Sequence, residues 1–342
     1  MKQPRRKQKR ETPHIFDRTI KYLLHETGTA NTVSLINALF ERQYAYDSPV
    51  RFAKTEGLRK RGKTLELFHA DIILSVADDD FAIEFQIGDD EIIGLRLFEY
   101  GFRHAHGTRR ITGRGELVEM DLPDACVVYF ENTKTTPEHI TFRLNHKTSG
   151  KFFDYDVRVF KMAEQTLESL ERQKLLLLLP FCLLRFRKEL EHTGTKPEAR
   201  LAVAKKERQA IDDLEDILLR ARESGFLGNY DGIMVLESIS RMHDELYGAY
   251  PEFQEAGMAV KERVEFTLAD YRRKLIKETQ TMAQSMAQSM AQSMVAAKSA
   301  EASAKTKDEI LGLFKQGYTV EEVEKMLAQE KAEDTETSTA SR

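Results

Sequence analysis

The stretch that decides the fold runs from Asp71 to Gln86 and reads D-I-I-L-S-V-A-D-D-D-F-A-I-E-F-Q. Its first half is apolar, the three aspartates at 78–80 indicate a polar turn, and its second half alternates apolar and polar side chains. Alternation with period two is typical of a strand whose two faces meet different surroundings. We therefore expect two paired strands, with Glu84 and Gln86 together on one face and with the opposite face buried.

Two carboxylates in this stretch are candidates for a metal site. If the two strands form a hairpin, Asp71 and Glu84 can come close together, and two carboxylates suit Mg²⁺, with Mn²⁺ as a possible substitute. A bound cation would activate water for attack on a phosphodiester, and Gln86 could orient that water. These three residues are our candidate catalytic residues. The alternative is that both carboxylates lie on a solvated sheet face.

The flanking sequence predicts a layered domain. Helical spacing of apolar residues indicates helices over 15–27, 32–46 and 89–106, and further strands are expected over 125–130, 140–144 and 153–160. This order favours an α/β or α+β domain with a central mixed sheet flanked by helices, ending near residue 163. Arg96, Tyr100 and Arg103 share one face of the third helix and could contact a phosphate, or they could form a surface stripe.

The remainder of the chain reads as an all-helical region. We expect helices over 163–187, 198–223, 231–247 and 253–277, and a place where homo-oligomers could form. Residues 282–294 repeat the letters M-A-Q-S, which indicates a helical spacer, a helix–helix seam or, less simply, a binding role for the methionines. The expected segments are a disordered basic arm 1–11, a layered domain 12–163, a helical region 164–280, a repeat linker 281–305, a short helical pair 306–330 and a disordered tail 331–342.

Composition excludes several classes of protein. The longest apolar run, residues 175–184, is half of the roughly 20 residues that a membrane span needs, so no membrane partner is expected. Two cysteines cannot form a disulfide framework, which favours the cytoplasm, and Cys126 lies in an apolar stretch that suits the core. The net charge of −4 conceals an uneven distribution, with six cations in residues 1–10 and eight acids in residues 71–91, so it does not exclude DNA.

One motif matches a phosphate-binding loop in its letters alone. Residues 57–64 read G-L-R-K-R-G-K-T and fit the pattern G-x-x-x-x-G-K-[ST]. Such a loop needs a helix directly after it, because amides at a helix N-terminus bind the phosphates. The sequence after Thr64 predicts a strand, so we expect no nucleotide cofactor.

Taken together, these motifs resemble the PD-(D/E)XK nuclease superfamily, and most of all its recombination-promoting nuclease, or putative transposase, branch. The resemblance covers roughly residues 12–163, and the later L-L-P-F-C-L-L segment is similar to the helical extension of such proteins. The stretches that carry it are T-P-H-I-F-D-R at 12–18 followed by Lys21, D-I-I-L-S-V at 71–76, I-E-F-Q at 83–86 and F-E-Y-G-F-R-H-A at 98–105.

The resemblance implies a restriction-endonuclease-like core that cleaves DNA with Mg²⁺. It implies Asp71 and Glu84 as metal ligands, and Asp17 as a residue that supports the site, although a capping role for Asp17 is an equal alternative. Gln86 stands where the superfamily usually has a lysine, which removes a positive side chain from the transition state. The alternative function is a catalytically inactive DNA-binding or assembly protein on a nuclease-like scaffold.

Overall fold

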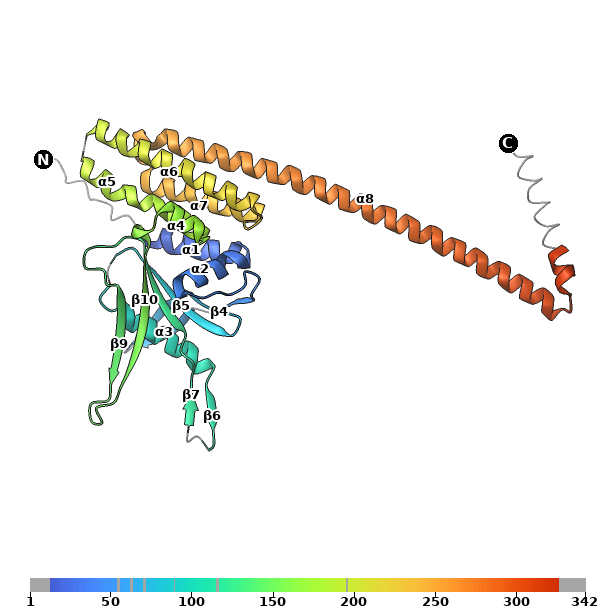
Figure 1. Ribbon diagram of the computed structural model, residues 1–342, viewed down its shortest axis with the longest axis horizontal. Coiled ribbons are helices and arrows are strands. Elements are labelled where there is room, and N and C mark those ends of the chain that lie inside the picture. The colour runs from blue at the N-terminus through green and yellow to red at the C-terminus, as the bar shows by residue number, and fades with distance from the viewer. Residues whose placement is uncertain are drawn as a thin grey trace. The chain divides into compact units, whose positions relative to one another are not determined.

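The computed structural model describes residues 13–53, 56–61, 64–69, 72–88, 90–114, 117–194 and 196–325 (Figure 1). The chain divides into two compact units, one ending at Tyr271 and the other beginning at Arg272. The first unit is an α+β structure with a six-stranded mixed sheet, flanking helices and a helical C-terminal region. The predicted fold class is confirmed at this level.

The sheet has the strand order β1-β4-β5-β8-β10-β9. Its strands are β1 (Val50–Phe52), β4 (Ile72–Val76), β5 (Asp79–Gln86), β8 (Asp124–Tyr129), β10 (Phe152–Lys161) and β9 (His139–Asn145). Strands β4 and β5 form the expected antiparallel hairpin, in which Ile72 pairs with Ile83. Its turn lies at residues 77–78, one residue earlier than expected, and Ala77 there has a φ of 54°. Strand β5 pairs with β8 in parallel, so the chain crosses over between them.

Two further hairpins lie outside the main sheet. They are β2 (Glu56–Arg61) with β3 (Thr64–His69), and β6 (Arg110–Thr112) with β7 (Leu117–Glu119). The Gly-Lys-Thr segment is followed by strand β3 rather than by a helix, as the sequence predicted. From Thr64 to His69 the described chain is thus a strand, which lacks the amides of a helix N-terminus.

The two faces of the sheet carry different cores. Helices α1 (Pro13–Glu26) and α2 (Thr29–Phe40) contribute to a large apolar cluster with β5 residues Ile83 and Phe85. Helix α3 (Ile93–Gly107) contributes with Ala82 and Tyr129 to a smaller cluster on the other face. Helix α2 is shorter than the predicted 32–46, because Glu41 adopts the left-handed conformation and ends it.

The helical region begins differently from the prediction of one helix over 163–187. The structure has, in order, η1 (Met162–Glu164), α4 (Leu167–Arg172), η2 (Leu176–Leu184) and α5 (Arg185–Thr193). Pro180 lies inside η2, where its missing N–H cannot support regular α-helical bonding. All nine residues of this 3-10 segment are buried, so the apolar run is core rather than a membrane segment.

The helices that follow share the core of the sheet. They are α6 (Pro197–Glu223), α7 (Asn229–Tyr247), η3 (Pro251–Phe253) and α8 (Gln254–Lys315). The rings of Phe130, just after β8, and Phe181, in η2, stack with centroids 4.2 Å apart, and one apolar cluster contains both. One apolar cluster thus includes residues from both sides of residue 163. The predicted domain boundary there stays a prediction.

The Met-Ala-Gln-Ser repeat lies inside α8, which runs through the predicted linker without interruption. The four repeat methionines are each more than 60% exposed. Residues 320–325 are helical again, close to the predicted short helical pair. Among the described residues, no helix is both long and apolar enough to cross a membrane.

Candidate functional site

The alternation along β5 separates core residues from candidate site residues. Ile83 and Phe85 belong to the large apolar cluster, whereas Glu84 and Gln86 point to the face that α3 covers. Glu84 is only 1% exposed. The Gln86 Nε2 donates a hydrogen bond of 3.1 Å to the Glu84 Oε1. The predicted shared face of Glu84 and Gln86 is confirmed, and it is a buried face rather than a solvated one at Glu84.

Arg96 of α3 is the cation of this site. Its Nη2 donates to the Glu84 carboxylate, and its Nη1 donates to Asp90 Oδ2 at 2.8 Å. Its Nε also lies 3.5 Å from the Tyr100 hydroxyl. Burial alone would lower the pKa of Arg96, but the Glu84 charge and the hydrogen bonds to Tyr100 and Asp90 raise it above its usual value. Arg96 therefore remains a cation next to the buried carboxylate.

A third side chain of α3 reaches β5 one helical turn further on. His104 Nε2 lies 2.8 Å from Asp80 Oδ2, and the Ser75 hydroxyl donates to Asp80 Oδ1 at 2.5 Å. The helix thus presents Arg96, Tyr100 and His104 to β5. The i, i+4, i+8 spacing follows one helical face, which includes His104 but does not separate it from Arg103 at i+7.

The predicted trio of phosphate-contacting residues is therefore divided. Arg96 and Tyr100 contact each other and adjoin Glu84. The Arg103 side chain is 39% exposed and lies 3.9 Å from Glu99 on its own helix, so its described partner is not part of the Glu84 group. Arg103 at i+7 fits the average helical period, but the residue that contacts β5 is His104 at i+8.

Two other candidates stand apart from this group. Asp71 lies outside the described residues, so its predicted pairing with Glu84 stays a prediction. Asp17 lies in the second turn of α1, and its Oδ1 is 2.8 Å from the Lys21 Nζ. This position is too far into the helix for the N-cap, so Asp17 does not cap α1.

The donor set around Glu84 is rich in oxygen but small. Among the described residues it includes the Glu84 carboxylate and the Gln86 side-chain amide. Within the described part of the chain, no group of three or more His, Cys, Asp or Glu residues could hold a metal ion. Asp71 lies outside these described residues. The absence of such a group also concerns ligands from the protein alone, without water or substrate oxygens.

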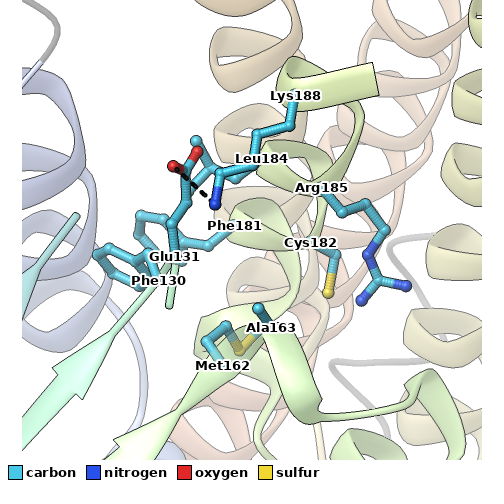
Figure 2. A pocket seen from close by; sticks show the side chains of 9 residues that line it. All are labelled: Phe130, Glu131, Met162, Ala163, Phe181, Cys182, Leu184, Arg185 and Lys188. Carbon is cyan, nitrogen blue, oxygen red and sulfur yellow. Dashed lines mark ion pairs between the residues drawn. The ribbon is translucent and has the colours of Figure 1, made fainter. Parts of the chain in front are cut away.

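A separate hollow of about 180 Å³ lies where the C-terminal end of β8 meets η2 and α5 (Figure 2). Phe130, Phe181 and Cys182 line it, and Glu131 pairs with Lys188 at 3.8 Å. Burial raises the pKa of the Cys182 thiol to about 12. A thiol that stays protonated at neutral pH is a poor nucleophile, so Cys182 has the character of a core residue.

Cys126 has the same character. It is fully buried in β8, and burial raises the pKa of its thiol to about 12. The expectation that Cys126 belongs to the core is confirmed.

Comparison with known proteins returned no match: no family model, no curated protein and no solved structure corresponds to this chain.

Proposed function

We propose that this protein is a Mg²⁺-dependent DNA endonuclease of the PD-(D/E)XK type, in which Mn²⁺ can replace Mg²⁺. The observation that carries the proposal is the buried Glu84, which a Gln86 amide and an Arg96 guanidinium contact at one face of the sheet. A buried carboxylate with specific polar partners is an unusual feature in a strand and is a candidate for a functional site.

The order of elements supports a restriction-endonuclease-like core. A helix precedes the antiparallel β4–β5 hairpin, α3 follows β5, and the chain then returns in β8, parallel to β5. This arrangement of strands and helix agrees with the resemblance found in the sequence. It places α3 over the polar face of β5, where a substrate phosphate would have to approach.

Asp71 is the proposed second metal ligand. The described pairing of β4 with β5 ends at Ile72 and Ile83. We propose that it continues by one residue, which would bring Asp71 opposite Glu84 on the same face. One or two carboxylates together with substrate phosphate oxygens and waters form a usual environment for Mg²⁺.

Each side chain would contribute a distinct role. A bound divalent cation supplies an activated water and offsets negative charge on the phosphodiester. Glu84 contributes a carboxylate whose position is fixed by Gln86 and Arg96. Arg96 carries the positive charge that Gln86 lacks, and its guanidinium can donate to a phosphate oxygen. Tyr100 helps to orient Arg96.

Nicking of supercoiled plasmid DNA in Mg²⁺ tests this proposal. We expect the wild-type protein to nick the plasmid and both Glu84→Gln and Asp71→Asn to abolish nicking. Asp78→Asn is the matched control, because it removes an exposed carboxylate from the turn of the same hairpin and should leave nicking unchanged. Circular dichroism would establish that all variants are folded. Equal nicking by Glu84→Gln and the wild type contradicts the proposal.

A second candidate is a DNA-binding or assembly protein without catalysis. The direct ion pair between Arg96 and Glu84 favours it, because the guanidinium already neutralises the carboxylate in place of a metal ion. This candidate predicts retention on DNA with a steep dependence on salt concentration, but no nicking in either Mg²⁺ or Mn²⁺.

A further inference from the structure

Aromatic side chains gather where α3 packs against β9 and β10. We call Phe98, Phe102, Phe142, Leu144 and Phe153 the aromatic patch. The Phe98 ring is central, with centroid distances of 6.0 Å to Phe102, 5.0 Å to Phe142 and 6.4 Å to Phe153. These contacts join one helix and two strands, so the residues form one continuous surface.

The register of the sheet explains why these residues share a face. Phe142 pairs with Tyr155, and Leu144 pairs with Phe153, so all four side chains point to the side of α3. Gly94 allows the close approach of the helix, because a Cβ at this position would lie 2.8 Å from a methyl carbon of Ile140. The close packing of α3 on β9 therefore depends on the absence of a side chain at Gly94.

The outer part of the aromatic patch is exposed to solvent. Phe102 is 43% exposed, Leu144 is 42% exposed and Phe153 is 46% exposed. Scattered apolar residues on a surface need no explanation, but a contiguous apolar group commonly marks an interaction site. The question is which partner this surface fits.

The segments that carry the aromatic patch are basic, which favours an anionic partner. Residues 100–114 contain four arginines and no acid, and residues 142–153 contain Arg143, Lys147 and Lys151 and no acid. Asp121 pairs with Arg110, and Asp154 pairs with Arg143. Across the described chain, Arg109, Arg114, Lys147 and Lys151 have no carboxylate partner.

We propose that the aromatic patch binds an unpaired DNA strand, whose bases stack on Phe102 and Phe153 while these cations contact its phosphates. Aromatic rings beside cations are the means by which proteins bind single strands, since each base offers a face for stacking. A duplex keeps its bases stacked internally and cannot offer them to the patch. A second copy of the chain is disfavoured, because two such basic surfaces would repel each other. The choice of DNA as the polyanion rests on the proposed function.

Fluorescence anisotropy with labelled oligothymidylate tests this inference. An oligonucleotide of about 20 nucleotides exceeds the ~4–16 nucleotides that single-strand-binding folds commonly cover. The titrations are made in EDTA, so that they do not depend on a metal ion or on cleavage. We expect the wild-type protein to bind the single strand more tightly than a duplex of the same length.

The decisive variants are Phe153→Ala and Phe102→Ala. Loss of one base stack predicts a roughly 5- to 150-fold weaker affinity for the single strand, with little change for the duplex. Phe153→Tyr should retain the wild-type affinity, because its ring can still stack. Phe266→Ala is the matched control: Phe266 is 67% exposed on α8, away from the aromatic patch, and its removal should have no effect.

Three results would overturn the inference. They are an unchanged affinity in Phe153→Ala, an equal loss for the duplex and the single strand, or a wild-type dimer that Phe153→Ala dissociates in sedimentation velocity. The wild-type protein in the two assays separates this inference from the proposed nuclease. Single-strand binding by the wild-type protein without any nicking would reject the enzyme and retain the aromatic patch, whereas nicking by the wild-type protein without single-strand preference would do the reverse.

Discussion

The two faces of the central sheet use the same strands for different purposes. On one face, Ile83 and Phe85 join a large apolar cluster that helices from both halves of the first unit cover. On the other face, Glu84 and Gln86 lie under α3 with the Arg96 cation. Strand β5 supplies both sets by simple alternation. The apolar face supplies stability to the fold, and this stability offsets the cost of burying a charged group on the other face.

The largest expected effect concerns the apolar face. Phe181 is 1% exposed and stacks on Phe130, so Phe181→Ala should lower the free energy of unfolding by about 3–5 kcal/mol. Urea unfolding measures this change. A loss below about 1 kcal/mol would show that the helical region adds little to the core of the sheet, and the comparison of the two faces would then fail.

The second effect concerns the polar face. Arg96→Met leaves the buried Glu84 without its guanidinium, and removal of one partner from a buried pair costs about 3–5 kcal/mol. Because the Arg96 side chain is 31% exposed, we expect a smaller loss of about 2–3 kcal/mol in unfolding free energy. The double variant Arg96→Met/Glu84→Gln should recover much of this loss. Simple additivity of the two changes in urea unfolding would argue against the coupling.

A buried carboxylate away from the sheet gives a smaller effect with a defined pH dependence. Burial raises the pKa of Glu215, and Arg263 at 3.2 Å lowers it only in part. A pKa raised in the folded state means that stability is largest below the ordinary value of 4.5 and falls as the pH rises through the raised value.

Glu215→Gln removes this titration. We expect the variant to be more stable than the wild type at neutral pH, by less than about 1 kcal/mol, and the difference to vanish near pH 4. Urea unfolding at both pH values is the measurement. A variant that is less stable at neutral pH would mean that the Arg263 ion pair outweighs the cost of burial.

The smallest effect on stability belongs to the aromatic patch. Phe153 is 46% exposed, so Phe153→Ala should change the unfolding free energy by no more than about 0.5 kcal/mol. This small change contrasts with the large loss expected for Phe181→Ala, although both variants remove a phenyl ring. If urea unfolding instead gave a loss above about 2 kcal/mol for Phe153→Ala, the patch would be part of the core rather than a binding surface.

The sequence predicted the parts of the structure that depend on local periodicity. The alternation from Phe81 to Gln86 predicted the shared face of Glu84 and Gln86, and the helical spacing predicted that Arg96 and Tyr100 lie together. It did not predict His104 in place of Arg103, because the average helical period allows both positions. Only the packing of α3 on β5 selects His104.

Other features depend on contacts between distant segments. The 3-10 segment at 176–184 is stabilised by complete burial, and apolar composition alone is equally compatible with an α-helix. The stacking of Phe130 on Phe181 joins the sheet to the helical region, although these residues are far apart in sequence. A composition change near residue 163 therefore indicated a new type of secondary structure, but not a separate core.

The most direct test of the proposed site is a titration of the protein with Mn²⁺, in which electron paramagnetic resonance measures the remaining free ion. We predict a binding site in the wild-type protein that Glu84→Gln and Asp71→Asn each remove and that Asp78→Asn retains. If Glu84→Gln bound Mn²⁺ as tightly as the wild type, Glu84 would not be a metal ligand, and this result would contradict the proposed nuclease site.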